Sequence, residues 1–591
     1  MDKGIIRDFL VTYIVKFRRT ALLSLALMLL TATARMAPPY ILKIAIDRFI
    51  ARQDFYGLSL MAVCYLAFIG MEYGTLYFQI YTTQRFGQNV IKEMRLATFA
   101  HLLSLPVPYF DKTPHGKSLN YLTSDMENIN EFITSGIVTT LADLITIVGI
   151  LGVMVYLSLP LTGVVFLFFL ILFLVTNSFR KRFSTVYRDA REGGSEMNAF
   201  LQESFAGMYV SKVFNRKDAE ISAFDVRNRH YIEAFKKVTF YLALYFPLVE
   251  FIGVFSVLAL LWASGQLLIL YGFGAITFGT IVAFIEYSQK LYNPIRDLSE
   301  KYNLYQNAFS SLEKLHNLHN LEKERHEGDE TQVRGDIVLK DVWLSYEKDD
   351  VYALKGISLA IKEGERVGVV GLTGSGKTSL INLLLGFYKP TKGEISIGGK
   401  GMEHYSLGAI RKAFGIVSQD VFIFPRTIRE NLFMAGEEAP ARELSPILKG
   451  FCGEDLHKTI AEDGVNLSEG EKQLISIGRV LAYKPRYLIL DEATSRIDPY
   501  LEARVRQALN NDFPSATWIV IAHSMATMAE MDRIFVIHDG RIAESGTHGQ
   551  LMDEGGIYSH LYSIYAGRHS AEKEKHAYED LRGQTWRNGV E

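Results

Sequence analysis

The chain has 591 residues and a formal net charge of −2 at neutral pH. This length favours several domains over one. The net charge argues against nucleic acid as a partner, because no basic domain stands out. Cys64 lies in an apolar stretch and Cys452 in the polar half, so a disulfide framework is not expected. The long apolar runs lie before about residue 300, and the remainder has the pattern of a mixed α/β domain.

The first predicted element is an amphipathic helix over residues 3–19. Its apolar side chains recur at helical spacing and form one stripe, with the charged residues elsewhere. We expect this helix to lie on the inner membrane surface. A signal peptide, with Ala32-Thr33-Ala34 as its cleavage site, is the alternative; it is disfavoured because the amphipathic lead is too long and too regular.

Six apolar stretches follow, and most are long enough to cross a hydrocarbon core of about 30 Å. They are centred near residues 21–46, 58–81, 133–157, 161–177, 240–271 and 274–292. Lys and Arg are frequent between the second and third stretches and between the fourth and fifth, whereas the links at 158–160 and 272–273 are uncharged. By the positive-inside rule the long polar segments are cytoplasmic, as is the second half of the chain. The pattern predicts a multi-pass protein of the inner (cytoplasmic) membrane, in contact with its lipids.

The polar segments keep helical periodicity well beyond the bilayer. Residues 58–105 contain no proline and, if helical throughout, span about 70 Å. Breaks at residues 110–116 and 214–218 are predicted to be elbows that press on the soluble domain, and Thr123-Ser124-Asp125 restarts a helix after the first. Separate helices with a connecting loop, and simple surface turns at the elbows, remain alternatives.

Four ionisable residues fall within the apolar stretches: Arg35, Glu72, Glu250 and Glu286. Charge at bilayer depth is costly, so such residues favour a functional interpretation, in which they line a polar substrate cavity or release a cation. A place at a helix end or in a structural ion pair explains them equally well.

The strongest motif is a phosphate-binding loop. The strand-like residues 366–370 lead into Gly-Leu-Thr-Gly-Ser-Gly-Lys-Thr, and an apolar helix follows. The glycines let backbone N–H groups wrap the phosphates of ATP, the lysine reaches the β- and γ-phosphates, and the threonine hydroxyl binds Mg²⁺. The candidate ATP-binding residues of this loop are Gly371, Leu372, Thr373, Gly374, Ser375, Gly376, Lys377 and Thr378.

Two further strands end in catalytic residue types. Residues 487–490 precede Asp491 and Glu492, where the first is suited to hold Mg²⁺ and the second to activate water as a general base. Residues 518–522 precede His523, which is suited to position the γ-phosphate. A lone histidine is more often structural; its occurrence with the other motifs favours a catalytic role.

These residues together resemble the nucleotide-binding domain of ABC transporters, and the first half resembles the six-helix membrane domain of the exporter type. The resemblance rests further on a signature-like segment, a D-loop-like segment and single residues. It implies that Tyr346 stacks on adenine, that Gln419 links Mg²⁺ to the membrane domain, that Asp498 belongs to the D-loop, and that residues 462–464 form the exporter-specific loop. The signature-like residues Ser468, Glu469, Gly470 and Glu471 are implied to complete the ATP site of a partner subunit.

Two departures from the family pattern bear on assembly. Glu469 and Glu471 add carboxylates to a signature that usually reads Leu-Ser-Gly-Gly-Gln, which is expected to weaken the partner's site by like charge. The interval between Gln419 and Ser468 is short, so a trimmed helical subdomain is expected. A homodimer of half-transporters is slightly favoured, and a heterodimer stays open.

The predicted fold class is a membrane all-α six-helix domain joined to an α/β P-loop NTPase domain of ABC type. The expected organisation is a transmembrane domain at 1–320, a linker at 321–335, a nucleotide-binding domain at 336–567 and a polar tail at 568–591. The resemblance implies ATP-driven export or flipping of small amphiphiles, drugs or lipids by alternating access. An importer of a siderophore-like compound and an ATP-gated channel or sensor are the alternatives.

Overall fold

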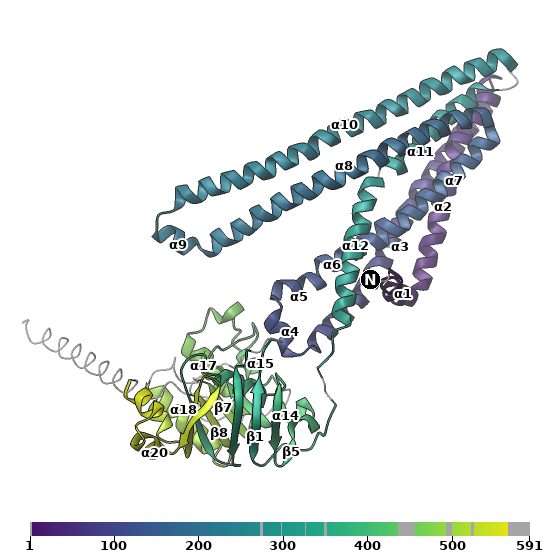
Figure 1. The fold of residues 1–591 in the computed structure, drawn as a ribbon. Helices are drawn as coiled ribbons and strands as arrows, with labels where there is room; N and C mark the ends of the chain where they lie inside the picture. Colours follow the sequence, from purple (N-terminus) through teal and green to yellow (C-terminus); the bar gives the residue numbers. More distant parts are fainter. Residues whose placement is uncertain are drawn as a thin grey trace, which may run out of the picture. The chain divides into compact units, whose positions relative to one another are not determined.

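A computed structural model describes residues 3–271, 276–296, 298–324, 327–347, 351–434, 456–491, 499–521 and 525–564. The chain divides into two compact units. The first comprises Met1–Leu105 and Thr113–Glu322, and the second comprises Pro106–Lys112 and Lys323–Glu591. Each unit is described by itself (Figure 1).

The described residues of the first unit form helices joined by short turns. Helix α1 ends at a break at Phe17, and Asp54 caps the start of α3 by accepting a hydrogen bond of 3.0 Å from the Gly57 N–H. The elements up to the first elbow are α1 (Lys3–Lys16), α2 (Arg18–Ile44), the π-helix η1 (Ala45–Ile50) and α3 (Phe55–Leu103). The 49 residues of α3 form one helix, which confirms the predicted extension beyond the bilayer.

The remaining helices of this unit follow the first elbow. They are α5 (His115–Leu122), α6 (Ser124–Glu131), the π-helix η2 (Phe132–Val138), α7 (Thr139–Leu157), α8 (Leu159–Ala206), α9 (Met208–Val213), α10 (Lys217–Tyr271), α11 (Phe278–Arg296) and α12 (Leu298–His319). The predicted restart at Ser124 is confirmed. It is anchored because the buried Asp125 accepts hydrogen bonds from Ser311 (2.7 Å) and Lys314 (2.9 Å) of α12.

Within the described residues, five helices are long and apolar enough to cross a membrane. They fall in Arg18–Ile50, Phe55–Leu103, His115–Leu157, Leu159–Ala206 and Lys217–Ile269. The sixth predicted stretch corresponds to α11, a helix of 19 residues that is not among these five. The predicted fold class of a helical membrane domain followed by an α/β domain is confirmed.

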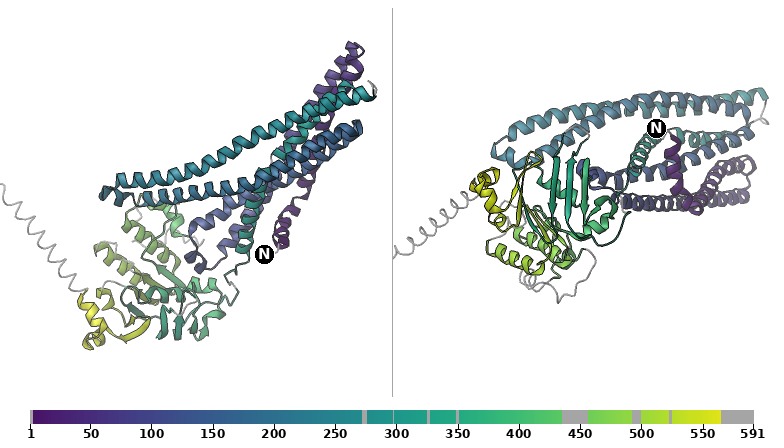
Figure 2. Two further views of the ribbon diagram at one scale, coloured as in Figure 1. Left: turned by 45° about the horizontal axis from the view of Figure 1, so that its top comes forward. Right: turned by 60° about the horizontal axis from the view of Figure 1, so that its bottom comes forward.

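Helices α8 and α10 run side by side and are joined at their far end by the short α9 (Figures 1 and 2). Phe179 and Phe183 of α8 pack against Tyr245 of α10, and the Tyr245 hydroxyl lies 3.2 Å from the Thr176 hydroxyl. This hairpin leaves the apolar side of α9 uncovered: Tyr209 is 82% exposed and Phe214, just beyond the helix, is 72% exposed.

The described strands of the second unit form two sheets. The four-stranded sheet has the order β2-β1-β4-β5, with antiparallel pairing between its neighbours. Its strands are β1 (Ile337–Leu344), β2 (Leu354–Ile361), β4 (Lys392–Ile397) and β5 (Lys400–Gly401). The six-stranded sheet has the order β10-β9-β3-β8-β7-β6 and is parallel except at the β9–β10 pair. Its strands are β3 (Arg366–Val370), β6 (Phe414–Val417), β7 (Tyr487–Asp491), β8 (Thr517–Ile521), β9 (Arg533–His538) and β10 (Arg541–Gly546).

The parallel sheet is buried on both faces. Tyr487 and Ile489 of β7 belong to one hydrophobic cluster, and Leu488 and Leu490 belong to another, as expected when successive side chains point to opposite faces. Helices and helical turns cover the two faces: α13 (Lys377–Leu384), η3 (Met402–His404), α14 (Leu407–Ala413), α15 (Ile428–Leu432), η4 (Glu462–Gly464), α17 (Glu469–Tyr483), α18 (Pro499–Asp512), α19 (Met525–Met528) and α20 (His548–Asp553). The short α4 (Val107–Lys112) also belongs to this unit.

Candidate ATP-binding and hydrolysis site

The phosphate-binding loop lies between β3 and α13, as its motif predicts. Gly374 and Gly376 have φ angles of +82° and +110°, which L side chains rarely adopt. A Cβ at Gly371 would lie 2.3 Å from the Ile537 carbonyl oxygen. Because these positions exclude side chains, phosphate oxygens can approach the backbone N–H groups closely. The loop therefore fits the phosphates of ATP.

Three side chains of the loop complete this fit. The Lys377 Nζ donates hydrogen bonds to the carbonyl oxygens of Gly371 (2.8 Å) and Leu372 (3.0 Å), which holds the ammonium group across the loop. The buried Ser375 hydroxyl has no hydrogen-bond partner among the described residues, and such a group is costly unless a ligand satisfies it. Thr378 is exposed on the first turn of α13. A polyanion and a hard cation suit these donors.

The sheet brings two further predicted residues to the same edge. Asp491 is the last residue of β7, and Gln419 follows β6 by two positions. Strands β3, β8, β7 and β6 are neighbours and parallel, so their carboxyl ends share one edge with the loop. This edge is where α/β sheets bind ligands. Thr378, Gln419 and Asp491 are thus the residues that would hold Mg²⁺, whose chemistry is to neutralise phosphate charge.

Three predicted residues lie outside the described part of the chain. Glu492 and Asp498 follow β7, and His523 follows β8. Their roles in water activation, in the D-loop and at the γ-phosphate stay predictions. The predicted trimming of the segment between Gln419 and Ser468 also stays a prediction, because residues 435–455 are not described.

Tyr346, the predicted adenine-stacking residue, lies beside the loop helix. Its hydroxyl donates a hydrogen bond of 2.9 Å to the Ser379 Oγ on α13 and accepts one of 3.3 Å from the Asn382 amide. Its ring meets that of Tyr388 edge to face, with centroids 4.8 Å apart. Tyr346 is therefore next to the nucleotide site, and its stacking role stays a prediction.

The signature-like segment forms the start of α17. Ser468 is the N-cap, and its Oγ accepts a hydrogen bond of 3.3 Å from the Glu471 N–H. The Glu471 carboxylate accepts hydrogen bonds from the Ser468 N–H (2.7 Å) and Oγ (2.8 Å), which completes a capping box. The hydrogen bonds from Ser468 lower the pKa of Glu471. Glu469 forms an ion pair of 3.0 Å with Lys472, and Gly470 follows it within the first turn of the helix.

The two carboxylates of the signature are therefore engaged locally. Glu471 binds the hydroxyl that the family resemblance assigns to a partner's γ-phosphate. The sequence predicted repulsion from these charges but not this hydrogen bond. The spacing Ser-x-x-Glu ahead of an apolar helix is a capping-box pattern, so the signal was present in the sequence.

A contact that the sequence did not specify joins the first elbow to the nucleotide site. Lys112 Nζ donates a hydrogen bond of 2.6 Å to the Tyr346 carbonyl oxygen, and the Tyr388 hydroxyl donates one of 2.6 Å to the Asp111 carboxylate. Burial and the bond to Asp111 raise the pKa of Tyr388 above its ordinary value. The elbow itself was predicted from its Pro and Gly residues; its partners lie more than 200 positions away, 234 and 277 respectively.

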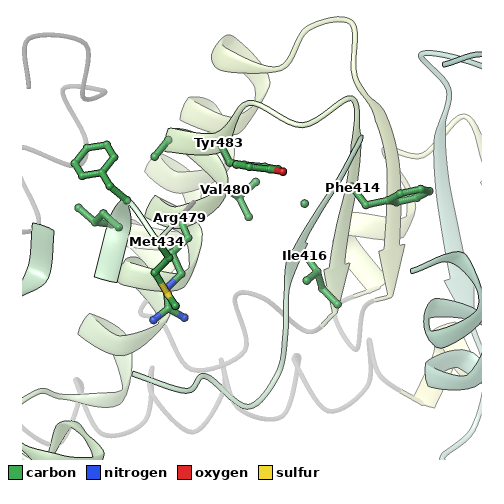
Figure 3. Close-up of a pocket in the computed structure, with 10 residues that line it drawn as sticks. Phe414, Ile416, Met434, Arg479, Val480 and Tyr483 are labelled. Atoms are coloured by element: carbon green, nitrogen blue, oxygen red, sulfur yellow. The ribbon is translucent and has the colours of Figure 1, made fainter. Parts of the chain in front are cut away.

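A small pocket elsewhere in the unit is not the nucleotide site. It has a volume of about 190 Å³ and lies between β6 and α17. Figure 3 shows Val480 and Tyr483 across from Ile416, with Arg479 beside Met434. Arg479 is already engaged, because its guanidinium donates hydrogen bonds to the backbone of Phe422 and to Asn431. The pocket includes none of the predicted ATP-binding residues.

The four ionisable residues that the sequence places in apolar stretches differ in their contacts. Arg35 of α2 forms an ion pair of 3.2 Å with Glu72 of α3, and Lys290 of α11 donates a hydrogen bond of 2.9 Å to the Arg35 carbonyl oxygen. These contacts support a structural role. Glu286 is half-buried on α11. Glu250 is exposed on α10, and none of the ion pairs between described residues includes it.

A phosphate-binding loop at the carboxyl edge of a parallel sheet, in one chain with several membrane-length helices, defines a membrane-bound P-loop ATPase. Comparisons with known proteins narrow this class. A family model described as ABC transporter transmembrane region matches residues 21–295, and one described as ABC transporter matches residues 354–495. The chain belongs to the ABC transporter family.

Individual relatives match most of the chain. An uncharacterized ABC transporter ATP-binding protein of Bacillus subtilis, YknU, is 31% identical over 562 residues, which cover 93% of this chain and 95% of that protein. The ATP-dependent lipid A-core flippase of Neisseria meningitidis is 33% identical over 490 residues, with coverages of 80% and 78%. A solved bacterial Atm1-family ABC exporter with ATP bound has a similar fold, with a TM-score of 0.76 at 24% identity and coverages of 93% and 98%. The chain is thus an exporter-type ABC transporter, an ATPase coupled to transport across a membrane.

Proposed function

We propose that the chain exports or flips an amphiphilic small molecule, drug or lipid across the cytoplasmic membrane, by alternating access, as a dimer of half-transporters. The proposal is carried by the elbow contacts at the nucleotide site. Asp111 and Lys112 bond to Tyr388 and Tyr346, and Tyr346 bonds to Ser379 on the helix that begins at Lys377. Movement of the phosphate-binding loop can thus reach the elbow through direct hydrogen bonds.

The residues of the site divide the chemistry among them. Backbone N–H groups of the loop and Lys377 bind phosphates, and Thr378, Gln419 and Asp491 hold Mg²⁺. Glu492 orients and deprotonates the attacking water, and His523 positions the γ-phosphate. Replacing Glu492 with glutamine keeps the shape of the side chain but removes the carboxylate that acts as the general base. We therefore expect Glu492→Gln to trap an ATP-bound dimer, seen by nucleotide retention; normal turnover would contradict the assignment.

An amphiphilic substrate is supported by the surface of α10. Glu250 is the only charged side chain between Phe240 and Tyr271, and it is exposed. Placing it against lipid tails would cost roughly 3 kcal/mol, so an aqueous cavity or a dimer interface is favoured. Phe251 and Phe255 beside it are exposed, and their mutually tilted rings have centroids 4.5 Å apart. An aromatic surface with one carboxylate suits a cationic amphiphile; the flippase relative acts on a lipid.

A dimer is supported by the uncovered tip of the α8–α10 hairpin, defined as Met208, Tyr209, Val210, Val213 and Phe214. Each of these residues is between 38% and 82% exposed. The tip lies at the end of the polar extension, beyond the apolar part of α10, so lipid does not cover it under the proposed orientation. Apolar clusters of this kind are typical of surfaces that bind another protein. The tip, together with the family's use of paired ATPase domains, favours a second copy of the chain as that protein.

Transport in purified vesicles tests the proposal. The full chain would be reconstituted in phospholipid vesicles, and ATP added outside would reach the outward-facing ATPase domains. We expect ATP-dependent accumulation of a fluorescent lipophilic cation inside the vesicles, lost in Lys377→Ala. Flux out of the vesicles would instead identify an importer. ATP hydrolysis without any flux of cations, neutral drugs or labelled phospholipids would contradict transport of amphiphiles.

A further inference from the structure

An apolar cavity lies in the membrane unit, which does not contain the phosphate-binding loop. It is a cavity of about 400 Å³ between the end of α1, the first half of α2, α3, the π-helix η2 and the start of α7. Met28, Phe86 and Ile133 form its floor, and each is at most 4% exposed. Leu22, Leu25 and Leu141 line the cavity and are also exposed, so it opens to the outside of the unit.

The interior of this cavity suits hydrocarbon. Its one buried polar group, the Ser24 hydroxyl, already has a partner 2.6 Å away in the Thr83 hydroxyl. An apolar cavity whose polar groups are satisfied does not hold ordered water. From Arg18 to Met28 the cavity follows eleven residues of α2, a rise of about 15 Å, which is half of a hydrocarbon core of about 30 Å. That is the depth of one acyl chain.

The mouth of the cavity carries positive charge. Arg18 is the charged residue in the lining, and it is exposed. None of the ion pairs or side-chain hydrogen bonds between described residues engages it. The nearby Lys16, in contrast, is neutralised by Glu93 at 3.2 Å. A guanidinium at the membrane surface, directly above an apolar cavity, is complementary to a phosphate that carries an acyl chain.

One wall of the cavity has an unusual backbone. Ile133, Ile137 and Val138 belong to η2, the π-helical segment Phe132–Val138. π-helical turns are rare, and they occur frequently at functional sites. The same segment contacts α3, where the Thr134 side chain lies against Gly87 closely enough to exclude a Cβ there. An occupant of the cavity would therefore touch the irregular turn that starts the α7 span.

We propose that this cavity binds one acyl chain of an anionic phospholipid from the leaflet at the Arg18 end, and that Arg18 binds its phosphate. The site is distinct from the transported substrate's path and holds a lipid of the surrounding bilayer. It links lipid composition to the packing of α1, α2 and η2. Because binding is measured directly, the site can be tested whether or not the proposed transport activity is confirmed.

Photolabelling of the full chain in lipid nanodiscs tests this site. Nanodiscs of phosphatidylcholine would contain traces of phosphatidylglycerol or phosphatidylcholine with a diazirine on one acyl chain. We expect the phosphatidylglycerol probe to label peptides that contain residues 14–28 or 133–141 about fivefold more than the neutral probe, because one arginine near a membrane surface contributes about that factor. Equal labelling by the two probes would overturn the proposal.

Five variants separate the site from general surface effects. Arg18→Gln removes the headgroup preference and Arg18→Lys keeps most of it, whereas Arg19→Gln, on the adjacent exposed position, leaves it within about twofold. Ala21→Phe fills the cavity and lowers labelling by both probes; Ala26→Phe, on the same helix but outside the lining, does not. Equal losses in Arg18→Gln and Arg19→Gln would overturn the site. Displacement of the label by transported amphiphiles, and not by unlabelled phosphatidylglycerol, would reassign the cavity to the substrate.

Discussion

At the residue scale, two acceptors compete for the hydrogen bond that the Ser468 hydroxyl donates. In the structure the acceptor is the Glu471 carboxylate, and in the proposed dimer it is a γ-phosphate bound at the other subunit. Glu471 has a pKa below its ordinary value because of the bonds from Ser468, so it stays charged at neutral pH. Both the competition and the like charge oppose closure of the partner's ATP site.

We expect Glu471→Gln to raise the maximal ATPase rate about fivefold, since removing a screened like charge is worth roughly 1 kcal/mol. Glutamine still completes a capping box, so thermal stability should change little. The control is Glu430→Gln, because Thr427 and Glu430 form the same capping box at the start of α15. A gain in both variants, or in neither, would show that the signature carboxylate does not restrain turnover.

Glu250 gives a second prediction at this scale. If its carboxylate faces a cationic amphiphile, Glu250→Gln should raise the concentration of cation needed for half-maximal ATPase stimulation about fivefold, while a neutral amphiphile is unaffected. ATPase titrations with a matched cationic and neutral pair measure this. If the half-maximal concentration rose equally for both compounds, the substitution would have disturbed packing, and recognition of the positive charge by Glu250 would be contradicted.

Functional residues could be predicted from the sequence only where they follow one another in the chain. The loop from Gly371 to Thr378 could be recognised because its residues and its flanking strand and helix follow one another. The Arg35–Glu72 pair could not, because it depends on the register of two helices over 37 positions. A sequence pattern gives the composition of each helix face but not which face its neighbour presents.

At the element scale, the position of the first elbow could be predicted from the sequence, but its contacts could not. Its Pro and Gly residues predict where the helix must stop, and α4 does lie between α3 and α5. What it touches depends on tertiary packing. Two hydrogen bonds, from Lys112 and to Asp111, fix the elbow beside the loop helix.

We expect Tyr388→Phe to lower the amount of substrate moved per ATP about fivefold, because a hydrogen bond contributes a net free energy of about 1 kcal/mol. The Michaelis constant for ATP should stay unchanged, since Tyr388 is not part of the loop. Flux and phosphate release measured in the same vesicles give the ratio. Tyr405→Phe is the control: its hydroxyl donates to the Ile397 carbonyl oxygen in the same unit but not to the elbow. An unchanged ratio in Tyr388→Phe would exclude this bond from coupling.

At the scale of the whole molecule, the proposed dimer requires burial of the hairpin tip of Met208, Tyr209, Val210, Val213 and Phe214. Burying one such side chain contributes roughly 2 kcal/mol. Tyr209→Ser or Phe214→Ser should therefore raise the dimer dissociation constant more than about tenfold and lower ATPase activity at dilute protein. Val226→Ser is the matched control, because Val226 is 66% exposed on α10 outside the tip. Pull-down of differently tagged copies measures assembly, and equal recovery for all variants would remove the tip from the interface.

The same uncovered tip has a consequence for the life of the protein in the cell. In the proposed dimer a second copy covers these aromatic groups. Before assembly they are exposed to water, and proteases and chaperones act on such surfaces. We expect solitary copies to be degraded quickly and assembled ones to persist. At low expression the steady-state amount of the protein would then increase more steeply than its rate of synthesis. The number of active transporters would depend on how often newly synthesised chains meet and assemble.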